Sequence, residues 1–306
     1  MTLRTLVPVL PLALAFFVLS LTAHAQSPLT TDPIPDKSAA AALETFQLPS
    51  HGALLNAFMY TAEGPGPHPT VILLHGFPGN ERNLDLAQAI RRAGWNVLYF
   101  DYRGSWGTPG TFSFTHCIED TEAALAWLRD PINAKKLRTN PKSIVLIGHS
   151  MGGFIALNVA AKDPAIAAVV SISAANMAGR TLPIVQAHQE QAALPKIAAA
   201  LDANGLAPLN GCTPPACATN LAKELFANAA NWDIPSLAPK LATRPILIIS
   251  SDDGNTPSAE ALATALEKAG STQAKSVHLA TDHSYSDKRI ALAQTILDSL
   301  NSLHPQ

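Results

Sequence analysis

The 306-residue sequence is poor in charge and has no strong excess of either sign. Only 14% of its residues are Asp, Glu, Lys or Arg, and the formal net charge is −2. Without a basic excess, the chain has no electrostatic footprint for nucleic acid or for an anionic membrane surface. The basic pairs Arg91-Arg92 and Lys135-Lys136 are isolated and are typical of solvated surface. We therefore predict that nucleic acid is not a partner.

Cysteine is also scarce, with three residues in the whole chain. Cys212 and Cys217 lie close together in a Pro-rich loop, and no His or further Cys nearby completes a zinc site. In an oxidising compartment such a pair forms a disulfide that staples the loop. Cys117 is expected to be a small buried hydrophobic residue, because nothing around it supplies a base. The sequence thus predicts one disulfide, no metal site and no catalytic cysteine.

An apolar run at residues 6–21 is short and interrupted by two prolines, which favours a cleaved signal peptide over a spanning helix, and no later segment is long and apolar enough to span a bilayer. Arg4 precedes this run, and Ala23-His24-Ala25 fits the small-x-small rule for cleavage before Gln26. Residues 1–25 are therefore predicted to be a signal peptide, which makes the protein exported, either periplasmic or secreted. Residues 26–44 are polar and Pro-rich, and we expect a flexible N-terminal arm.

Short β-branched runs alternate with helical patterns along the rest of the chain. This alternation predicts an α/β domain over residues 45–303, with a mostly parallel sheet flanked by helices. Edge strands are expected within 45–61. The further strands expected are 70–74, 96–101, 143–148, 165–173, 245–250 and 276–279, and the helices are 81–93, 117–129, 153–161, 258–269 and 287–303.

The segment at about 175–243 interrupts this alternation. It has helical patches without a convincing strand, and it contains the two neighbouring cysteines. A structureless loop of this length is implausible in a compact domain, so we expect a helical cap. Caps of this kind exclude water from an active site and shape the substrate pocket.

The most informative motif is Gly148-His149-Ser150-Met151-Gly152, which lies between a predicted strand and a predicted helix. A G-x-S-x-G in this context is typical of a nucleophile elbow, where small residues let strand and helix pass closely. Ser150 is the candidate nucleophile. A serine hydroxyl needs a base within hydrogen-bond reach, and that base needs an orienting carboxylate.

His283 is the candidate base, because it follows the last predicted strand and precedes the terminal helix. His278 lies within a strand pattern and is expected to be structural. The acid follows the strand at 245–250. We favour Asp253 and keep its neighbour Asp252 as the alternative acid, because only one of two adjacent side chains can normally point at the imidazole. Asp282, beside the histidine, is a third and weaker candidate.

Catalysis at a serine also requires donors for the oxyanion of the tetrahedral intermediate. The Met151 N–H lies at the start of the helix after Ser150, where negative charge develops. The second donor is expected from the loop after an earlier strand, His75-Gly76-Phe77-Pro78-Gly79. The Phe77 N–H is therefore the second predicted oxyanion donor.

These motifs together resemble the landmarks of the α/β-hydrolase superfamily. His75–Gly79, Asp101-Tyr102-Arg103-Gly104, Gly148–Gly153, Asp253 before Pro257, and Asp282-His283 occur in the family's order over nearly all of residues 45–303. The resemblance implies an eight-stranded hydrolase core, a Ser-His-Asp triad and no cofactor. One departure is Ser250-Ser251-Asp252-Asp253 in place of the usual Gly-x-x-Asp, which leaves the acid open. An ion pair between Asp101 and Arg103 is expected to order the loop after the fourth strand.

The sequence therefore predicts an exported serine hydrolase that cleaves a small carboxylic ester through an acyl-enzyme. A peptidase or amidase of the same fold is the first alternative, since the run from Asp101 to Trp106 also resembles prolyl-oligopeptidase-like enzymes. A short peptide would then be the substrate, with Glu190 or Glu224 of the cap holding its amine. The second alternative is a non-catalytic binding protein on a hydrolase fold, because fold alone does not fix function.

Overall fold

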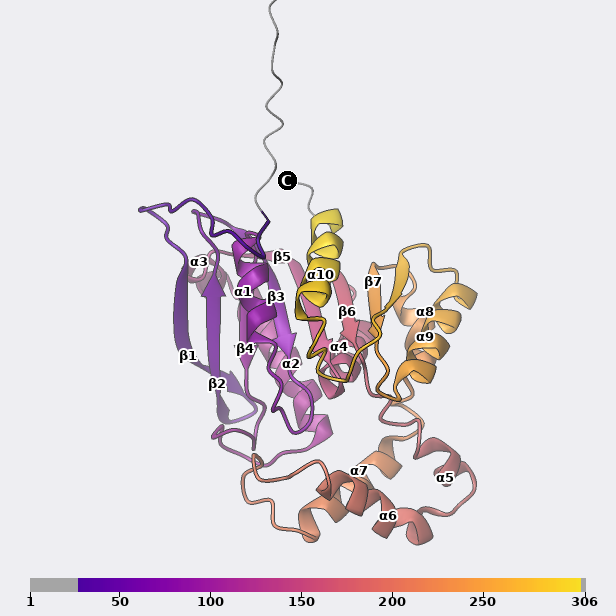
Figure 1. Cartoon of the computed structure of the whole chain (residues 1–306). Coiled ribbons are helices and arrows are strands. Elements are labelled where there is room, and N and C mark those ends of the chain that lie inside the picture. The colour runs from indigo at the N-terminus through magenta and orange to yellow at the C-terminus, as the bar shows by residue number, and fades with distance from the viewer. Residues whose placement is uncertain (1–26, 304–306) are drawn as a thin grey trace, which may run out of the picture.

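A single eight-stranded sheet organises the computed structural model, which describes residues 27–303 (Figure 1). The strand order is β1-β2-β4-β3-β5-β6-β7-β8. β1 and β2 pair antiparallel, as do β2 and β4, and all other neighbours are parallel. The predicted eight-stranded, mostly parallel α/β-hydrolase sheet is confirmed. The predicted signal peptide, residues 1–25, lies outside the described residues.

The strands lie close to the predicted ranges, with β5 longer than expected. Their bounds are β1 Ala42–Ser50, β2 Ala53–Thr61, β3 His68–Leu74, β4 Asn96–Phe100, β5 Thr139–His149, β6 Ala168–Ile172, β7 Ile246–Ser250 and β8 Ala274–His278. The last three residues of the predicted arm, 42–44, belong to β1. The residues before them contact the domain through Arg138, whose guanidinium donates to the carbonyls of Ala39 and Ala40 at 2.7 and 2.9 Å.

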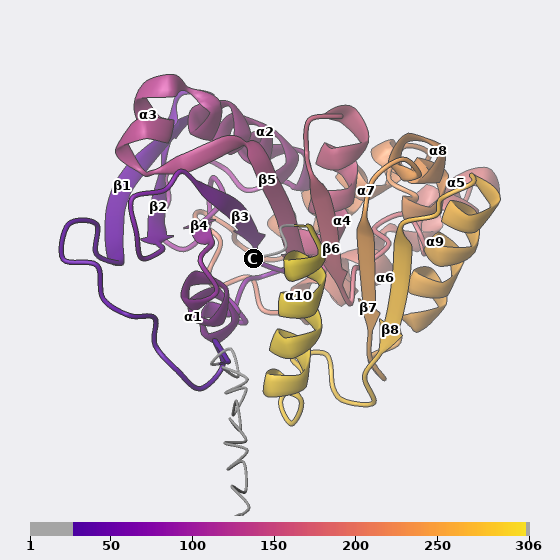
Figure 2. The same cartoon turned by 90° about the horizontal axis from the view of Figure 1, so that it is seen from above.

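Helices cover both faces of the sheet (Figure 2). The helices outside the predicted cap are α1 Leu84–Arg92, α2 Phe114–Arg129, α3 Pro131–Lys136, α4 Met151–Lys162, α9 Thr256–Lys268 and α10 Arg289–Leu303. On β3, Val71 and Leu73 pack into the hydrophobic cluster under α1 and α10, whereas Ile72 and Leu74 pack into the cluster under α2 and α4. This burial on both faces explains why the strand is apolar without alternation. No helix within residues 27–303 is both long and apolar enough to cross a membrane.

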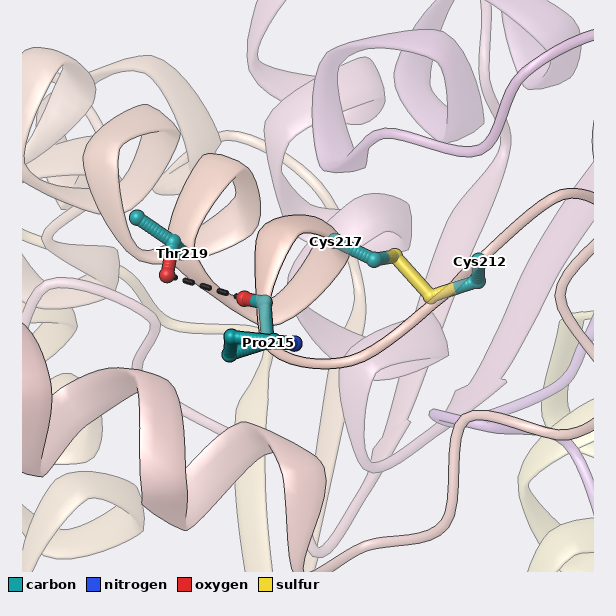
Figure 3. The surroundings of a disulfide bond; sticks show 4 residues. All are labelled: Cys212, Pro215, Cys217 and Thr219. Carbon is teal, nitrogen blue, oxygen red and sulfur yellow. Dashed lines mark hydrogen bonds between the residues drawn. A yellow bond between two sulfur atoms is a disulfide. The ribbon is translucent and has the colours of Figure 1, made fainter.

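The predicted cap segment is helical. It contains α5 Leu182–Gln186, α6 Glu190–Asp202 and α7 Ala216–Asn228, followed by η1 Ile234–Leu237 and α8 Ala238–Leu241. The helices α5, α6 and α7 lie beyond the carboxyl edge of the parallel strands, whereas α8 lies beside the sheet next to α9 (Figure 1). A disulfide joins Cys212 to Cys217, with a Cα–Cα distance of 5.1 Å, and closes the turn before α7 (Figure 3). Cys117 is buried in the core as a free thiol.

Two sets of hydrogen bonds attach the cap to the core. Glu224 of α7 accepts from the backbone N–H groups of Phe114 and Thr115 at 3.0 and 2.7 Å, and so caps the N-terminus of α2. In the second set, the backbone N–H of Trp106 donates to the Pro208 carbonyl at 2.8 Å, and the backbone N–H of Asn210 donates to the Gly104 carbonyl at 2.8 Å. The cap is therefore connected to the core by backbone contacts as well as by its two chain crossings.

The predicted ion pair between Asp101 and Arg103 is wrong. Arg103 turns toward α2, where its Nε donates to the fully buried Asp120 at 2.6 Å and its Nη2 contacts Glu119 at 2.5 Å. Asp101 lies instead 3.7 Å from Arg82. The buried carboxylate on α2 attracts the guanidinium more strongly than a neighbour in the same loop, because Asp120 has no access to water.

Asp120 is expected to be one of the most sensitive charged positions in the fold. Its carboxylate accepts from the Ser50 hydroxyl at 2.6 Å and from the Arg103 N–H at 2.8 Å as well as from the guanidinium. Replacing one partner of a buried ion pair leaves the other charge uncompensated, so D120N should lower the free energy of unfolding by about 3 kcal/mol. Urea unfolding followed by circular dichroism measures this difference.

Glu122 on the same helix provides the matched control. It forms an exposed pair with Lys162 at 2.9 Å, and such pairs contribute less than about 1 kcal/mol. E122Q should therefore leave the unfolding midpoint nearly unchanged. Equal losses in the two variants would contradict a special role for the buried pair.

Candidate active site

Ser150 lies at a sharp turn between the end of β5 and the start of α4. Its backbone has φ 58° and ψ −120°, a region that side-chain-bearing residues rarely adopt. Two glycines make this turn sterically feasible. A Cβ on Gly148 would lie 2.0 Å from the Gly152 carbonyl oxygen, and a Cβ on Gly152 would lie 2.1 Å from the Leu74 carbonyl oxygen. The sequence motif is therefore a strained strand–turn–helix in which neither glycine has room for a side chain.

His283 and Asp253 are hydrogen-bonded to each other, with 2.6 Å between His283 Nδ1 and Asp253 Oδ2. His283 precedes α10, and Asp253 follows β7. The Asp253 side chain is only 2% exposed. Burial acts to raise the pKa of Asp253, but hydrogen bonds from His283 and from the Asn255 N–H outweigh it and hold this pKa well below its ordinary value. Asp253 is thus an ionised, oriented partner for the imidazole.

The other carboxylates considered for this role have different partners. Asp252 is 64% exposed and lies 3.1 Å from Nε2 of His278, on β8. Asp282 accepts from the Ser286 N–H and hydroxyl at 2.8 and 2.7 Å, within its own turn. Of the three candidate acids, Asp253 is the one whose carboxylate contacts the His283 ring.

His149 is a neighbour of this pair that sequence reasoning missed. Its Nε2–H donates to the backbone carbonyl of His283 at 2.8 Å, and the two ring centroids are 4.6 Å apart. Burial lowers the pKa of His149 to about 4, so the ring is neutral near pH 7. The variable residue of the G-x-S-x-G motif therefore holds the loop that contains the candidate base. Only its adjacency to Ser150 could have suggested this contact.

The loop after β3 presents the predicted second oxyanion donor. Within residues 27–303, neither the Phe77 N–H nor the Met151 N–H donates to another group of the protein. Two side chains fix the conformation of this loop. The Trp106 indole N–H donates to the Pro78 carbonyl at 2.8 Å, and the His75 ring contacts the Gly76 carbonyl at 2.8 Å. Two N–H groups from residues that line the same cavity as Ser150 thus have no partner within residues 27–303.

Two adjoining cavities meet at Ser150. The larger, of about 450 Å³, lies under the cap and is lined by Ser150, Phe77, Met151 and residues of the cap. The smaller, of about 220 Å³, is lined by Ser150, His283 and the loop after β3. Ser150 is therefore accessible from both sides, and its candidate base lines only the smaller cavity.

No hydrogen bond joins Ser150 Oγ to His283 in the described part of the chain, although both residues line the smaller cavity. Catalytic hydrogen bonds are often long in ligand-free enzymes and shorten when substrate binds, so this geometry is compatible with general-base chemistry. Among residues 27–303, no group of three His, Cys, Asp or Glu side chains is arranged to hold a metal ion.

The chain is similar to known proteins both in sequence and in fold. A family model for the alpha/beta hydrolase fold matches residues 69–261. An uncharacterised protein of Mycobacterium tuberculosis is 33% identical over 114 residues, which are 37% of this chain and 38% of that protein. The matched region thus spans well under half of this curated relative.

Solved structures with the same fold include esterases. EstE1, a thermostable carboxylesterase from a metagenomic library, superposes with a TM-score of 0.63 at 20% identity, covering 91% of this chain and 92% of its own. An esterase of Pyrococcus furiosus superposes with a TM-score of 0.61 at 16% identity, covering 89% of this chain and 97% of its own. At these identities the likeness concerns the fold. With the family model matching well over half of its length, the chain belongs to the alpha/beta hydrolase family.

Proposed function

We propose that the protein is a serine hydrolase that cleaves a carboxylic ester through an acyl-enzyme. The observation that carries this proposal is the Asp253–His283 hydrogen bond beside Ser150, with two unused N–H donors flanking the serine. Esterases among the proteins of similar fold support the same reaction class. No component of this site requires a cofactor.

The chemistry follows from the positions of these groups. Ser150 Oγ attacks the ester carbonyl carbon while His283 takes the hydroxyl proton, and Asp253 stabilises the imidazolium that forms. The carbonyl oxygen becomes an oxyanion held by the N–H groups of Phe77 and Met151. When the intermediate collapses, the bond to the alcohol oxygen breaks and His283 protonates the departing alcohol. Water, deprotonated by His283, then releases the acid and restores Ser150.

The peptidase alternative receives little support from the cap carboxylates proposed for it. Glu224 uses both oxygens to cap α2, and neither Glu224 nor Glu190 lines either cavity at Ser150. Neither of the two cap carboxylates named for the task is therefore placed to hold a substrate amine at Ser150. Ester cleavage remains the better-supported reaction.

A paired turnover panel on the purified protein tests this proposal. We expect hydrolysis of p-nitrophenyl esters to exceed that of aminoacyl p-nitroanilides, and to fall by at least about 10⁴-fold in kcat for S150A. A fluorophosphonate probe should label Ser150 in the folded protein. Full esterase turnover in S150A would refute the mechanism, and a folded protein that fails to react with the probe would indicate a non-catalytic binding protein.

The two adjacent aspartates provide an internal comparison of the proposed triad. D253N should lower kcat by about 10³–10⁴-fold, because the amide no longer fixes the imidazole in the required tautomer. D252N should change kcat by less than about tenfold, since Asp252 is exposed and contacts His278. Steady-state kinetics with one p-nitrophenyl ester measures both variants. A larger loss in D252N than in D253N would show that Asp252, not Asp253, is the acid of the triad.

We also propose that the protein is exported. The predicted leader at residues 1–25 and the Cys212–Cys217 disulfide support an oxidising compartment. Expression of the full chain in a bacterial host, followed by N-terminal sequencing of the periplasmic or medium fraction, should find Gln26 as the first residue. Retention of residues 1–25 on protein recovered from the cytoplasm would contradict this assignment.

A further inference from the structure

The two cavities at Ser150 contain different parts of the proposed catalytic machinery. Met151, whose N–H is an oxyanion donor, lines only the larger cavity under the cap. His283, which must protonate the leaving group, lines only the smaller cavity. Because the departing alcohol has to lie next to His283, the alcohol part of the substrate belongs in the smaller cavity. The acyl part then extends into the larger cavity.

The walls of the larger cavity are mixed in character. Apolar side chains include Met177, Ile197, Leu201 and Leu225, which suit an aliphatic chain. Arg180 is the one charged residue that lines it, and no acidic residue does so. The smaller cavity differs, because Glu81 is among the residues that line it. The site is therefore asymmetric in charge, with a cation on the acyl side and an acid on the alcohol side.

Arg180 has no competing partner in the part of the chain that the structure describes. It lies in the segment between β6 and α5, its side chain is exposed, and within residues 27–303 it forms no ion pair or hydrogen bond. Arg82, Arg103, Arg129 and Arg289, in contrast, each pair with a carboxylate. A guanidinium can bind a carboxylate or a phosphate with two parallel hydrogen bonds.

Taking the proposed esterase function as its basis, we propose that the natural acyl group carries an anion, a carboxylate or a phosphate, away from the scissile carbonyl. Arg180 binds this anion and acts as a specificity-determining residue. The aliphatic part of the acyl group packs on the apolar wall of the larger cavity. A half-ester of a dicarboxylic acid is the simplest substrate with this design.

Matched p-nitrophenyl esters test this proposal by varying only the acyl terminus. The mono-p-nitrophenyl ester of adipic acid carries a carboxylate, p-nitrophenyl methyl adipate is its neutral counterpart, and p-nitrophenyl 6-phosphooxyhexanoate carries a phosphate. The ratio of kcat/KM for each charged ester to that for the neutral ester is measured in the wild type and in variants. This ratio should fall about fivefold in R180Q and further in R180E, since an exposed ion pair is worth that much at moderate salt. The charged ester with the larger fall identifies the preferred anion.

Two controls separate local recognition from general attraction. Lys196, exposed on cap helix α6, does not line either cavity, so K196Q should leave the ratio unchanged. Moving the carboxylate to the leaving group, in the hexanoyl ester of 5-hydroxy-2-nitrobenzoate, should abolish the dependence on Arg180. An unchanged kcat/KM ratio in R180Q would overturn the proposal. So would a fall of the ratio in K196Q as large as that in R180Q, or an equal loss in R180Q with the ester whose carboxylate is on the leaving group.

The neutral diester distinguishes this proposal from the reaction itself. Its hydrolysis should disappear in S150A and persist in R180Q. Hydrolysis that survives in S150A would refute the serine mechanism, whatever the effect of Arg180. Hydrolysis that depends on Ser150 but is indifferent to the acyl charge would refute only the anionic acyl group.

Discussion

The close approach of β3, β5 and α4 around Ser150 is the constraint on which the site depends. The backbone of Gly152 passes so near the end of β3 that any Cβ would overlap the Leu74 carbonyl, and Gly148 is equally confined by Gly152. This proximity places the start of α4 beside the loop after β3. As a result, the N–H groups of Met151 and Phe77 flank one serine. A strained backbone at Ser150 is thus sustained by the packing of three elements around it.

The loop after β3 depends in turn on contacts that reach the cap. Trp106 hydrogen-bonds through its indole N–H to Pro78 in that loop, and through its backbone N–H to Pro208 in the cap. The Arg82 guanidinium lies 4.3 Å from the centroid of the same indole and adds a cation–π contact. One residue therefore contacts both the loop after β3 and the cap. A continuous chain of contacts thus runs from Pro208 in the cap to the Pro78 carbonyl, one residue after the Phe77 N–H.

The features that could be predicted from sequence are those encoded locally. The apolar runs predicted the sheet, and the glycines at 148 and 152 predicted the elbow, because both depend on residues adjacent in the chain. His283 could be placed because it follows the last strand. The choice between Asp252 and Asp253 remained open, since adjacent residues share their sequence context and differ only in side-chain direction. Direct contact with the His283 ring distinguishes them in the structure.

Contacts between distant segments could not be predicted in this way. The expected Asp101–Arg103 pair failed because Asp120, seventeen residues beyond Arg103, competes for the same guanidinium from a helix that the loop packs against. The contact between His149 and the His283 carbonyl spans 134 positions. The cap residues that line the larger cavity, such as Arg180, are likewise determined by how the cap helices pack over Ser150. Neither the hydrophobic pattern nor the secondary-structure propensity of a segment predicts such contacts, because the topology of the fold determines which distant segments meet.

The topology also places the proposed triad and the lining of the larger cavity on different segments of the chain. Ser150, Asp253 and His283 follow β5, β7 and β8, so the rigid parallel sheet fixes their relative positions. The cap is inserted after β6 and supplies Arg180 and most of the apolar wall of the larger cavity. Changes in the cap can therefore alter the charge and size of the larger cavity without moving the strands that hold the proposed triad. Because the cap lines most of the larger cavity and the loop after β3 lines most of the smaller one, the difference in charge between the two cavities follows from the point at which the cap enters the fold.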